Sequence, residues 1–243
     1  MIMELVGPAG AGKTTLVRYL SQHQENVWIA PDIELRKPGH LPSLLGNIPF
    51  LLSIYLHHDR PGRWLTWPEM KYLLYLRSWP SFIIRQDHSN KVILLDHGPV
   101  FKLATLHAFG PRWLQDPKCE SWWEKTLHRW ADLLDTVVWL DAADKVLAGR
   151  INQRDQRHLV KGKSNQEIEQ FLACYRSSYV QILRQLSKSR GIKMLSFDTN
   201  QASIEQIAGD LLFALDSMGG DIATKLSLDL IRDELLESEQ ISP

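Results

Sequence analysis

The sequence predicts an α/β fold in three layers, with a parallel five-stranded sheet and helices on both of its faces. Five short, almost continuously apolar runs alternate with stretches of helical apolar spacing; they cover residues 2–6, 27–30, 92–95, 136–140 and 193–197. Continuous rather than alternating apolar runs are typical of strands that are buried on both faces. Because such strands separated by helices form right-handed βαβ units, we expect all five to run parallel.

The length and composition fit one folded domain. The chain has 243 residues, of which 44% are hydrophobic and 23% are charged, and these values are ordinary for a globular protein. No internal repeat or low-complexity linker divides it, so we expect residues 1–243 to form a single domain. Within it we expect a largely helical insertion at about 38–90, a lid at about 150–164 and a C-terminal helix at about 222–236.

Charge, cysteine content and hydropathy exclude several classes of protein. The 28 basic and 28 acidic residues balance, so no electrostatic footprint predicts a nucleic-acid partner. The two cysteines, Cys119 and Cys174, lack a partner motif, which argues against a disulfide framework or zinc site and favours a reducing compartment. The most apolar stretch, 41–56, is shorter than the roughly 20 residues that span a bilayer. The first strand leaves no room for a signal peptide, so we expect a cytoplasmic protein with no membrane partner.

Residues 7–14 read GPAGAGKT and match the pattern G-x-x-x-x-G-K-[ST] at each fixed position. They lie between the first apolar run and residues 14–20, which have helical apolar spacing. A loop in this strand-to-helix setting can wrap an anion with its backbone N–H groups and the helix N-terminus. The alternative is a glycine-rich turn that happens to end in Lys-Thr, but the correct flanks favour the phosphate-binding loop of a P-loop NTPase fold.

This motif assigns individual roles to its last residues. We expect Lys13 to reach the β- and γ-phosphates of a nucleoside triphosphate, and the Thr14 hydroxyl to bind Mg²⁺. The residues predicted to contact the nucleotide through this loop are Gly7, Pro8, Ala9, Gly10, Ala11, Gly12, Lys13, Thr14 and Thr15.

Carboxylates follow three of the predicted strands directly, as Asp96, Asp141 and Asp198. The carboxyl edge of an open α/β sheet is where ligands bind. Asp96 can hold Mg²⁺ through water, or accept a proton from an attacking group. It can also cap a helix that starts at Pro99. These roles are compatible with one another, and the sequence leaves them open.

A cluster of cations follows the fourth predicted strand. Its members are Arg150, Arg154, Arg157, Lys161 and Lys163. The arginines recur at helical spacing, and a mobile lid that brings guanidinium groups to a transferring phosphoryl group would use them. The alternative is a solvated helix face with Asp155 and Glu167 as counterions. The phosphate-binding loop favours the lid.

The insertion is rich in aromatic residues interleaved with arginines. They are Trp64, Trp67, Tyr72, Tyr75 and Trp79, with Arg60, Arg63 and Arg77. They fit either an aromatic pocket for a ring-shaped ligand or the packing of an added helical layer. Residues 67–85 have a helical pattern that Pro80 is expected to kink or split. The histidines of the insertion, His57, His58 and His88, have no neighbouring ligand candidates and do not predict a metal site.

Five segments in a fixed order carry a resemblance to a known family. They are residues 7–15, the Leu-Asp-His-Gly of 95–98, Asp141 with Arg150 and Arg154, Phe171 with Tyr175, Arg176 and Tyr179, and Phe197-Asp198-Thr199. Over about residues 1–215 the chain resembles the thymidylate kinase-like P-loop kinases, a family that includes the deoxynucleoside kinases.

The resemblance implies a kinase that transfers the γ-phosphoryl group of ATP, with Mg²⁺, to a small-molecule acceptor, most simply a nucleoside or nucleotide. It implies that Arg150 lies near the adenine and that Asp198 and Thr199 border the base. It also implies that Arg154 and Arg157 close from the lid to act in catalysis with Lys13 and Asp96. A count along the chain places Arg77 near a family arginine that contacts the acceptor. A homodimer is compatible with this interpretation.

The sequence departs from the family at His97, because family members have an acid followed by arginine where this chain has Asp96-His97. An imidazole is shorter, is a weaker cation at pH 7 and is not bidentate. The contact that this arginine makes with the acceptor in the family must therefore be absent, be made by another residue, or not be needed. The second predicted strand is followed by Asp32 and Glu34, whose carboxylates fit recognition of a hydroxyl or amine better than of a phosphate. The substrate-binding candidates are Asp32, Glu34, Arg77 and His97.

Two alternatives to a nucleoside or nucleotide kinase remain open at this stage. The acceptor can be another small hydroxyl compound, such as a sugar or an antibiotic. The protein can also be an NTP-dependent switch that acts through a protein partner, with the aromatic insertion as its docking surface.

Overall fold

The computed structural model describes residues 1–24, 26–32, 46–47, 49–50, 52, 62–85, 91–155, 158–189 and 191–217. Several predicted features lie outside these residues: Glu34, Arg157, His57, His58, His88 and the C-terminal helix at about 222–236. No helix within the described ranges is long and apolar enough to cross a membrane.

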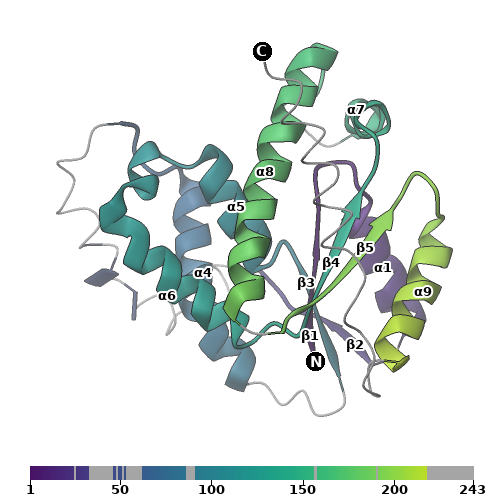
Figure 1. The fold of residues 1–243 in the computed structure, drawn as a ribbon, viewed down its shortest axis with the longest axis horizontal. Coiled ribbons are helices and arrows are strands. Elements are labelled where there is room, and N and C mark those ends of the chain that lie inside the picture. Colours follow the sequence, from purple (N-terminus) through teal and green to yellow (C-terminus); the bar gives the residue numbers. More distant parts are fainter. Residues whose placement is uncertain are drawn as a thin grey trace.

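A five-stranded, fully parallel sheet forms the centre of the molecule (Figure 1). Its strands are β1 (Ile2–Val6), β2 (Val27–Ile29), β3 (Val92–Asp96), β4 (Thr136–Asp141) and β5 (Lys193–Asp198). Their order across the sheet is β2-β3-β1-β4-β5. The five predicted strands are confirmed. Each begins where the sequence predicts, and β3, β4 and β5 extend one residue further, so that they end in an aspartate.

Helices cover both faces of this sheet, as the three-layer prediction requires (Figure 1). On one side lie α4 (Trp67–Arg85), α5 (Pro99–Phe109), α6 (Glu120–Ala131) and α8 (Asn165–Ser189). On the other side lie α1 (Lys13–His23) and α9 (Ile204–Ser217). The helix α7 (Asp144–Gln153) follows β4 at the carboxyl edge of the sheet, and the short 3₁₀ helices η2 (Arg112–Gln115) and η3 (Pro117–Cys119) precede α6.

Successive strand residues enter two separate hydrophobic clusters. One cluster, under α4, α5, α6 and α8, contains Val6, Ile93, Leu95, Val137 and Trp139. The other, under α1 and α9, contains Met3, Leu5, Leu94, Val138 and Leu140. All these side chains are buried. This two-sided burial explains why the strands appear in the sequence as continuous apolar runs.

The helix α4 continues through Pro80, so the expectation that proline splits this helix is wrong. Proline has no N–H to donate to the carbonyl of Leu76, four residues earlier. The indole N–H of Trp130 in α6 donates to that oxygen at 3.0 Å instead. Tyr75 stacks on Trp130 with ring centroids 5.7 Å apart, and Trp79 is fully buried. Much of the aromatic content of α4 therefore packs an added helical layer.

Candidate active site

The phosphate-binding loop connects β1 to α1 and needs its glycines. Gly7, Gly10 and Gly12 have φ values of 138°, 92° and 86°, in the region that side-chain-bearing residues avoid. A Cβ atom on Gly7 would also lie 1.9 Å from the carbonyl oxygen of Leu140 in β4. The loop is thus seated directly on the neighbouring strand. No side chain caps the N-terminus of α1, which leaves that end suited to an anion.

Lys13, the first residue of α1, folds back over its own loop. Its Nζ donates hydrogen bonds to the carbonyl oxygens of Gly7 at 2.7 Å and Pro8 at 2.8 Å. Burial lowers the pKa of Lys13 to about 8, and the nearby Asp96 opposes this effect. In the structure Lys13 thus contacts its own loop, and its contact with the β- and γ-phosphates stays a prediction. Phosphate oxygens would offer its ammonium charge-assisted bonds, which are stronger than bonds to two carbonyl groups.

Asp96 ends β3 beside the phosphate-binding loop. The hydroxyl of Thr14 donates to its Oδ2 at 3.4 Å. Its Oδ1 is buried and has no hydrogen-bond partner among the described residues, although Nδ1 of His97 lies 3.6 Å away. A hydroxyl and a carboxylate in this arrangement fit an Mg²⁺ ion that takes its other ligands from phosphate and water. In the described part of the chain, no three His, Cys, Asp or Glu side chains gather closely enough to hold a metal ion by themselves.

Glu4, not Asp96, caps α5, so the alternative that Asp96 caps this helix does not hold. Glu4 lies in the middle of β1 and is fully buried, and its two carboxylate oxygens accept the N–H groups of Val100 and Phe101, each at 2.9 Å. Burial raises the pKa of Glu4 to about 8, against the lowering effect of these hydrogen bonds. The sequence analysis missed this residue, although a single carboxylate inside an apolar strand was a visible signal.

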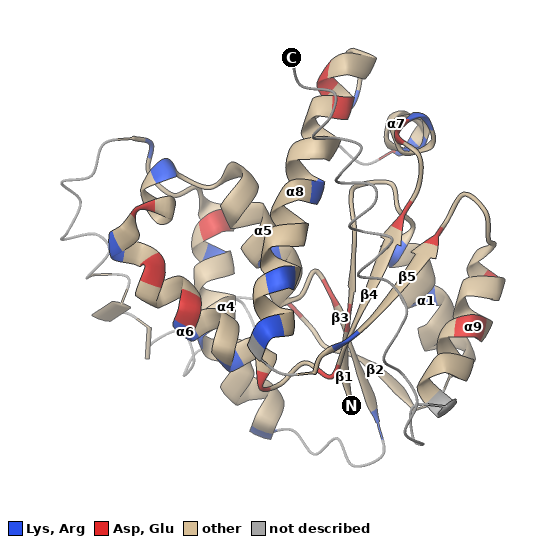
Figure 2. Ribbon diagram, viewed as in Figure 1, with Lys and Arg blue, Asp and Glu red and all other residues tan. Residues whose placement is uncertain are grey.

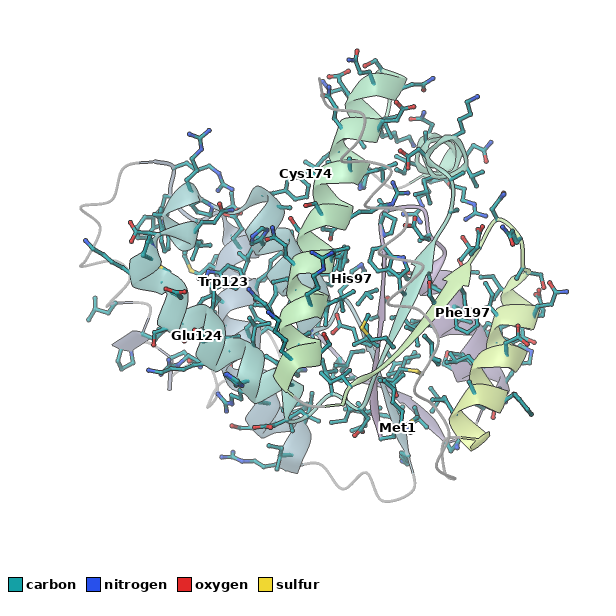
Figure 3. The ribbon with its side chains drawn as sticks, viewed as in Figure 1. Met1, His97, Trp123, Glu124, Cys174 and Phe197 are labelled. Carbon is teal, nitrogen blue, oxygen red and sulfur yellow. The ribbon has the colours of Figure 1, made fainter. Side chains whose placement is uncertain are left out.

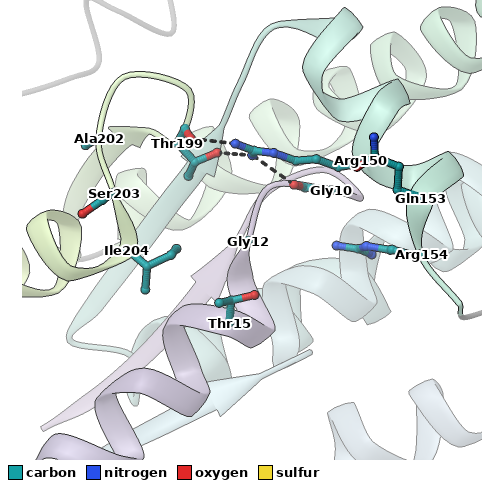
Figure 4. A pocket seen from close by; sticks show the side chains of 10 residues that line it. All are labelled: Gly10, Gly12, Thr15, Arg150, Gln153, Arg154, Thr199, Ala202, Ser203 and Ile204. Carbon is teal, nitrogen blue, oxygen red and sulfur yellow. Dashed lines mark hydrogen bonds between the residues drawn. The ribbon is translucent and has the colours of Figure 1, made fainter.

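A pocket of about 460 Å³ opens beside the phosphate-binding loop, between α7 and the segment that follows β5 (Figure 4). It is lined by Gly10, Gly12, Thr15, Arg150, Gln153, Arg154, Thr199, Ala202, Ser203 and Ile204. The structure thus brings together three segments that are far apart in the sequence. Six residues predicted to contact the nucleotide or the phosphoryl group line this pocket: Gly10, Gly12, Thr15, Arg150, Arg154 and Thr199.

Arg150 is held across this pocket by hydrogen bonds (Figure 4). Its guanidinium donates to Thr199 Oγ1 at 2.7 Å, to the Thr199 carbonyl at 2.8 Å and to the Gly10 carbonyl at 3.3 Å. Thr199 is itself fixed, because its backbone N–H and its hydroxyl both donate to the Asp141 carbonyl. A planar cation with a fixed orientation forms one wall of the pocket, as is suited to stacking on a flat ring.

The remaining lid cations have mixed surroundings. Arg154 is exposed, lines the pocket and lies near enough to Lys13 to contribute to lowering its pKa. The ammonium of Lys161 donates to the Arg154 carbonyl. Lys163 pairs with Glu167 at 3.5 Å on the surface, which is the contact that a solvated helix face would show. Two of the lid arginines therefore reach the pocket, whereas the described lysines do not line it.

The carboxylates at the ends of β4 and β5 accept hydrogen bonds that hold neighbouring segments of the site in place (Figure 2). Asp141 accepts two hydrogen bonds from Arg176 of α8, at 2.8 and 3.0 Å. Asp198 accepts the backbone N–H of Asn200 at 2.7 Å and so closes the turn after β5. Asp198 is not among the residues that line the pocket, and its contact with a base stays a prediction.

At the ends of β2 and β3, two predicted residues flank a lysine that the sequence analysis missed. Lys102 of α5 is 1% exposed, its Nζ lies 3.3 Å from Asp32 Oδ1, and it donates to the His97 carbonyl. The His97 side chain lies between the sheet and the α5 layer, with its ring 4.4 Å from that of Phe101 (Figure 3). Its backbone is left-handed, with φ of 58°. Burial lowers the pKa of His97, so it is a neutral imidazole at pH 7.

Arg77 does not join this group, which corrects its predicted position near the acceptor. Its guanidinium lies over the ring of Phe50 at 4.6 Å, and its carbonyl accepts a hydrogen bond from Arg129 of α6. The two tyrosines of α4 that face Lys102 are Tyr72 and Tyr75. At about 100° per residue, Arg77 lies about 140° and 160° around the helix from them. The prediction counted along the chain and did not include this rotation.

Comparison with known proteins places the fold in a recognisable group. No protein-family model and no curated sequence matches the chain. Solved structures do match, and the deoxyadenosine kinase from M. mycoides with bound dATP covers 89% of this chain and 100% of its own, at a TM-score of 0.51 and 15% identity. The thymidylate kinase from Candida albicans covers 90% of this chain and 92% of its own, at 0.54 and 16%. The YorR protein from Bacillus subtilis, in complex with phosphorylated GDP, covers 92% and 100%, at 0.50 and 16%.

At these identities the likeness shows the fold, which is that of the P-loop nucleoside and nucleotide kinases. The predicted fold class is confirmed, and the resemblance to the P-loop kinases is confirmed as a likeness of fold.

Proposed function

We propose that this protein is a phosphotransferase that moves the γ-phosphoryl group of Mg-ATP to a small-molecule acceptor, and that the acceptor is a nucleoside or nucleotide. The observation that carries the proposal is the position of the pocket. It begins at the glycines of the phosphate-binding loop, and the guanidinium of Arg150 lies across it. The fold supports the same activity, because its structural neighbours include a deoxyadenosine kinase and a thymidylate kinase.

The residues divide the task by their positions. The pocket between Arg150 and Ile204 would receive the base, and the loop of residues 7–12 with Lys13 would hold the phosphates. Mg²⁺ held by Thr14, with Asp96 bound directly or through water, would neutralise phosphate charge. Arg154, which already lines the pocket, would bring a second guanidinium to the transferring group. Catalysis of this kind depends mainly on positioning and charge neutralisation.

In the transfer itself, an acceptor oxygen forms a bond to the γ-phosphorus while the bond to the bridging oxygen breaks and ADP leaves. The proton of the acceptor passes to Asp96 or to water. The buried Oδ1 of Asp96, which has no hydrogen-bond partner in the described residues, is the group available to accept it. The acceptor would enter from the side of Asp32 and His97, at the ends of β2 and β3.

A transfer assay tests the proposal. Purified protein is incubated with Mg²⁺, γ-labelled ATP and, one at a time, deoxynucleosides, nucleoside monophosphates, sugars and aminoglycosides. We expect label to move to a member of the first two groups, and Lys13→Ala to abolish the transfer while it leaves the folded state intact. If label moves only to a sugar or an aminoglycoside, the proposed acceptor class is wrong and the proposed phosphoryl transfer is right.

Release of labelled phosphate that no acceptor stimulates would favour the NTP-dependent switch instead. The structure offers that alternative limited support, since Tyr75 and Trp79 of the insertion are buried in the core, although Trp67 is 56% exposed.

A further inference from the structure

Lys102 carries a buried positive charge that the packing of α5 does not require. The other residues of α5 on this face are apolar, and the Lys102 side chain is 1% exposed. Burial of an ammonium costs free energy, and a buried ion pair is often no more stabilising than apolar side chains of the same size. Two carboxylates oppose this cost, that of the exposed Asp32 and that of the buried Glu4 in β1, so charged partners rather than apolar packing account for a lysine here.

The Lys102 ammonium contacts residues of α4 and of the segments that follow β2 and β3. Its Nζ lies 3.8 Å from the ring centroid of Tyr75 and 5.7 Å from that of Tyr72, both in α4. At distances of this kind an aromatic ring attracts a cation. On the other side the ammonium reaches the Asp32 carboxylate after β2 and the His97 carbonyl after β3. Lys102 thus ties together the two strand ends that border the acceptor side.

Among the described residues of this group, the side chains of Asp32 and His97 are both accessible to solvent, and that of His97 is 45% exposed. The Asp32 side chain is 57% exposed, whereas the Lys102 side chain is closed off from solvent. An entering molecule therefore meets the Asp32 carboxylate beside the His97 imidazole, and the Lys102 ammonium behind the carboxylate helps to fix its orientation. Asp32 also acts to raise the pKa of His97, so its charge is felt at the imidazole. A cation at position 97 would consequently lie within electrostatic range of Asp32.

We propose that Lys102 is a positioning residue of the acceptor site, which supplies from α5 the positive charge that His97 does not provide. It holds Asp32 toward the entering acceptor, and the carboxylate then accepts a hydrogen bond from a hydroxyl or amine of that molecule. An acceptor that carries a phosphate at this end is disfavoured by the exposed negative charge. This inference rests on the proposed function and specifies how its acceptor side is built.

Titration calorimetry on the protein saturated with Mg²⁺ and a non-hydrolysable ATP analogue tests the role directly. The probes are the four deoxynucleosides and their 5′-monophosphates, and the variants are Lys102→Met, Asp32→Asn and their combination. We expect wild type to bind a deoxynucleoside more tightly than its monophosphate. Lys102→Met should weaken that binding about tenfold or more, by releasing the carboxylate from its charged partner. Because Lys102 acts through Asp32, adding Lys102→Met to Asp32→Asn should cost little more.

Further variants separate positioning from folding. The affinity for the ATP analogue should stay within about twofold of wild type in each variant, and the exposed Lys118→Met is the matched lysine control. Adding His97→Arg to Lys102→Met should restore part of the acceptor affinity, because the charge returns from the position where the resembling family carries it. A merely structural lysine would not be replaced in this way. If Lys102→Met does not fold, Asp32→Asn and His97→Arg in the wild-type background still report on the carboxylate and its charge environment.

The outcomes distinguish this inference from the proposed function. Acceptor binding that both Lys102→Met and Asp32→Asn leave unchanged would overturn the role of Lys102 and leave the kinase proposal standing. Tighter binding of the monophosphates than of the deoxynucleosides by wild type would overturn the inferred acceptor chemistry. A protein that binds the ATP analogue but none of these probes would do the same. Failure to bind the ATP analogue at all would overturn the proposed function itself.

Discussion

Glu4 lies so close to Gly98 that a side chain on this glycine would force the Glu4 carboxyl group to shift. A Cβ atom built on Gly98 would lie 2.7 Å from Cδ and 2.9 Å from Oε2 of Glu4. Glu4 holds the first N–H groups of α5, and Gly98 is the residue before that helix. The pair therefore fixes the turn that places Asp96 and His97 at the end of β3. Glu4 and Gly98 belong to no motif in the sequence, and yet they determine the geometry at this end of the candidate site.

Gly98→Ala is accordingly expected to destabilise the protein, although its φ of −73° suits any residue. The new methyl group displaces a buried carboxylate that has two hydrogen bonds, and overpacking of this kind costs about 1–3 kcal/mol. The matched control is Gly209→Ala in α9, where nothing lies within 4 Å of the added Cβ. That change should stabilise by about 0.5–1 kcal/mol, because alanine favours a helix. Urea unfolding gives the free energy of unfolding of both variants. A Gly98→Ala variant as stable as wild type would show that Glu4 moves freely.

Lys13 should make stability depend on pH in the alkaline range. Its pKa is about 8 in the folded protein, against an ordinary value of 10.5. Between these values the unfolded chain binds the proton and the folded protein does not, so the free energy of unfolding should rise as pH increases from about 8 to about 10.5. Below about pH 8 the full cost of the buried ammonium remains.

Lys13→Met should remove both the cost and the pH dependence. One pKa unit corresponds to about 1.4 kcal/mol, so the variant should be more stable than wild type at pH 7 by up to about 3 kcal/mol. It should also lose nucleotide binding. Urea unfolding of variant and wild type at several pH values gives the difference, with the exposed Lys118→Met as control. Parallel curves for Lys13→Met and wild type would show that burial does not perturb this lysine.

Thr199→Val tests the hydrogen bond that orients Arg150. Valine keeps the branched shape but cannot accept from the guanidinium, whose bond to the Thr199 hydroxyl is 2.7 Å long. Loss of a hydrogen bond to a charged group, and of the orientation it provides, should weaken binding of an ATP analogue about tenfold. Calorimetry measures this, with Ser187→Ala in α8 as the control hydroxyl deletion, because the Ser187 hydroxyl bonds only to the Arg184 carbonyl of its own helix among the contacts described. Unchanged affinity in Thr199→Val would mean that Arg150 does not contact the base.

The sequence predicted most of what depends on local pattern. The five strands, the phosphate-binding loop and α4 followed from apolar runs, glycine spacing and helical periodicity, and each is present in the structure. The structure also places Arg150 on the pocket, and its contact with a nucleotide stays a prediction. What the sequence did not reveal are Glu4 and Lys102, because their importance depends on which elements meet. A carboxylate in β1 becomes a helix cap only once β1 lies under α5.

The predicted position of Arg77 is wrong for a related reason. Its predicted position relied on distance along the chain, whereas its surroundings depend on how α4 is rotated against α5 and α6. Tyr72 and Tyr75 pack toward Lys102, and this rotation turns Arg77 toward Phe50. Side-chain volumes across three helices determine that rotation, and no local pattern in the sequence encodes it.

The predicted lid should become ordered when nucleotide binds. Arg154 and Lys161 carry like charges close to one another and would gain an anionic partner when phosphates bind, whereas Lys163 already pairs with Glu167. Hydrogen exchange should therefore slow in residues 158–164 on addition of Mg²⁺ and a non-hydrolysable ATP analogue. Lys13→Ala, which is expected not to bind the nucleotide, should show no such change. Equal exchange in wild type with and without nucleotide would identify this segment as a fixed surface.

Thymidylate should be a poor acceptor compared with an uncharged hydroxyl compound. The neutral imidazole of His97 supplies one donor where arginine supplies a fork, and a charge-assisted hydrogen bond contributes about 1.5–3 kcal/mol. Its absence should lower the affinity for a monophosphate by about one to two orders of magnitude. Arg77 cannot compensate, because it lies over Phe50, and Lys102, a described cation at this end of the sheet, is buried behind Asp32. Steady-state kinetics with thymidylate, thymidine and the remaining acceptors measure kcat/KM for each, and a value for thymidylate well above every uncharged compound would refute the argument from His97. His97→Arg should raise the value for thymidylate and leave the KM for ATP unchanged.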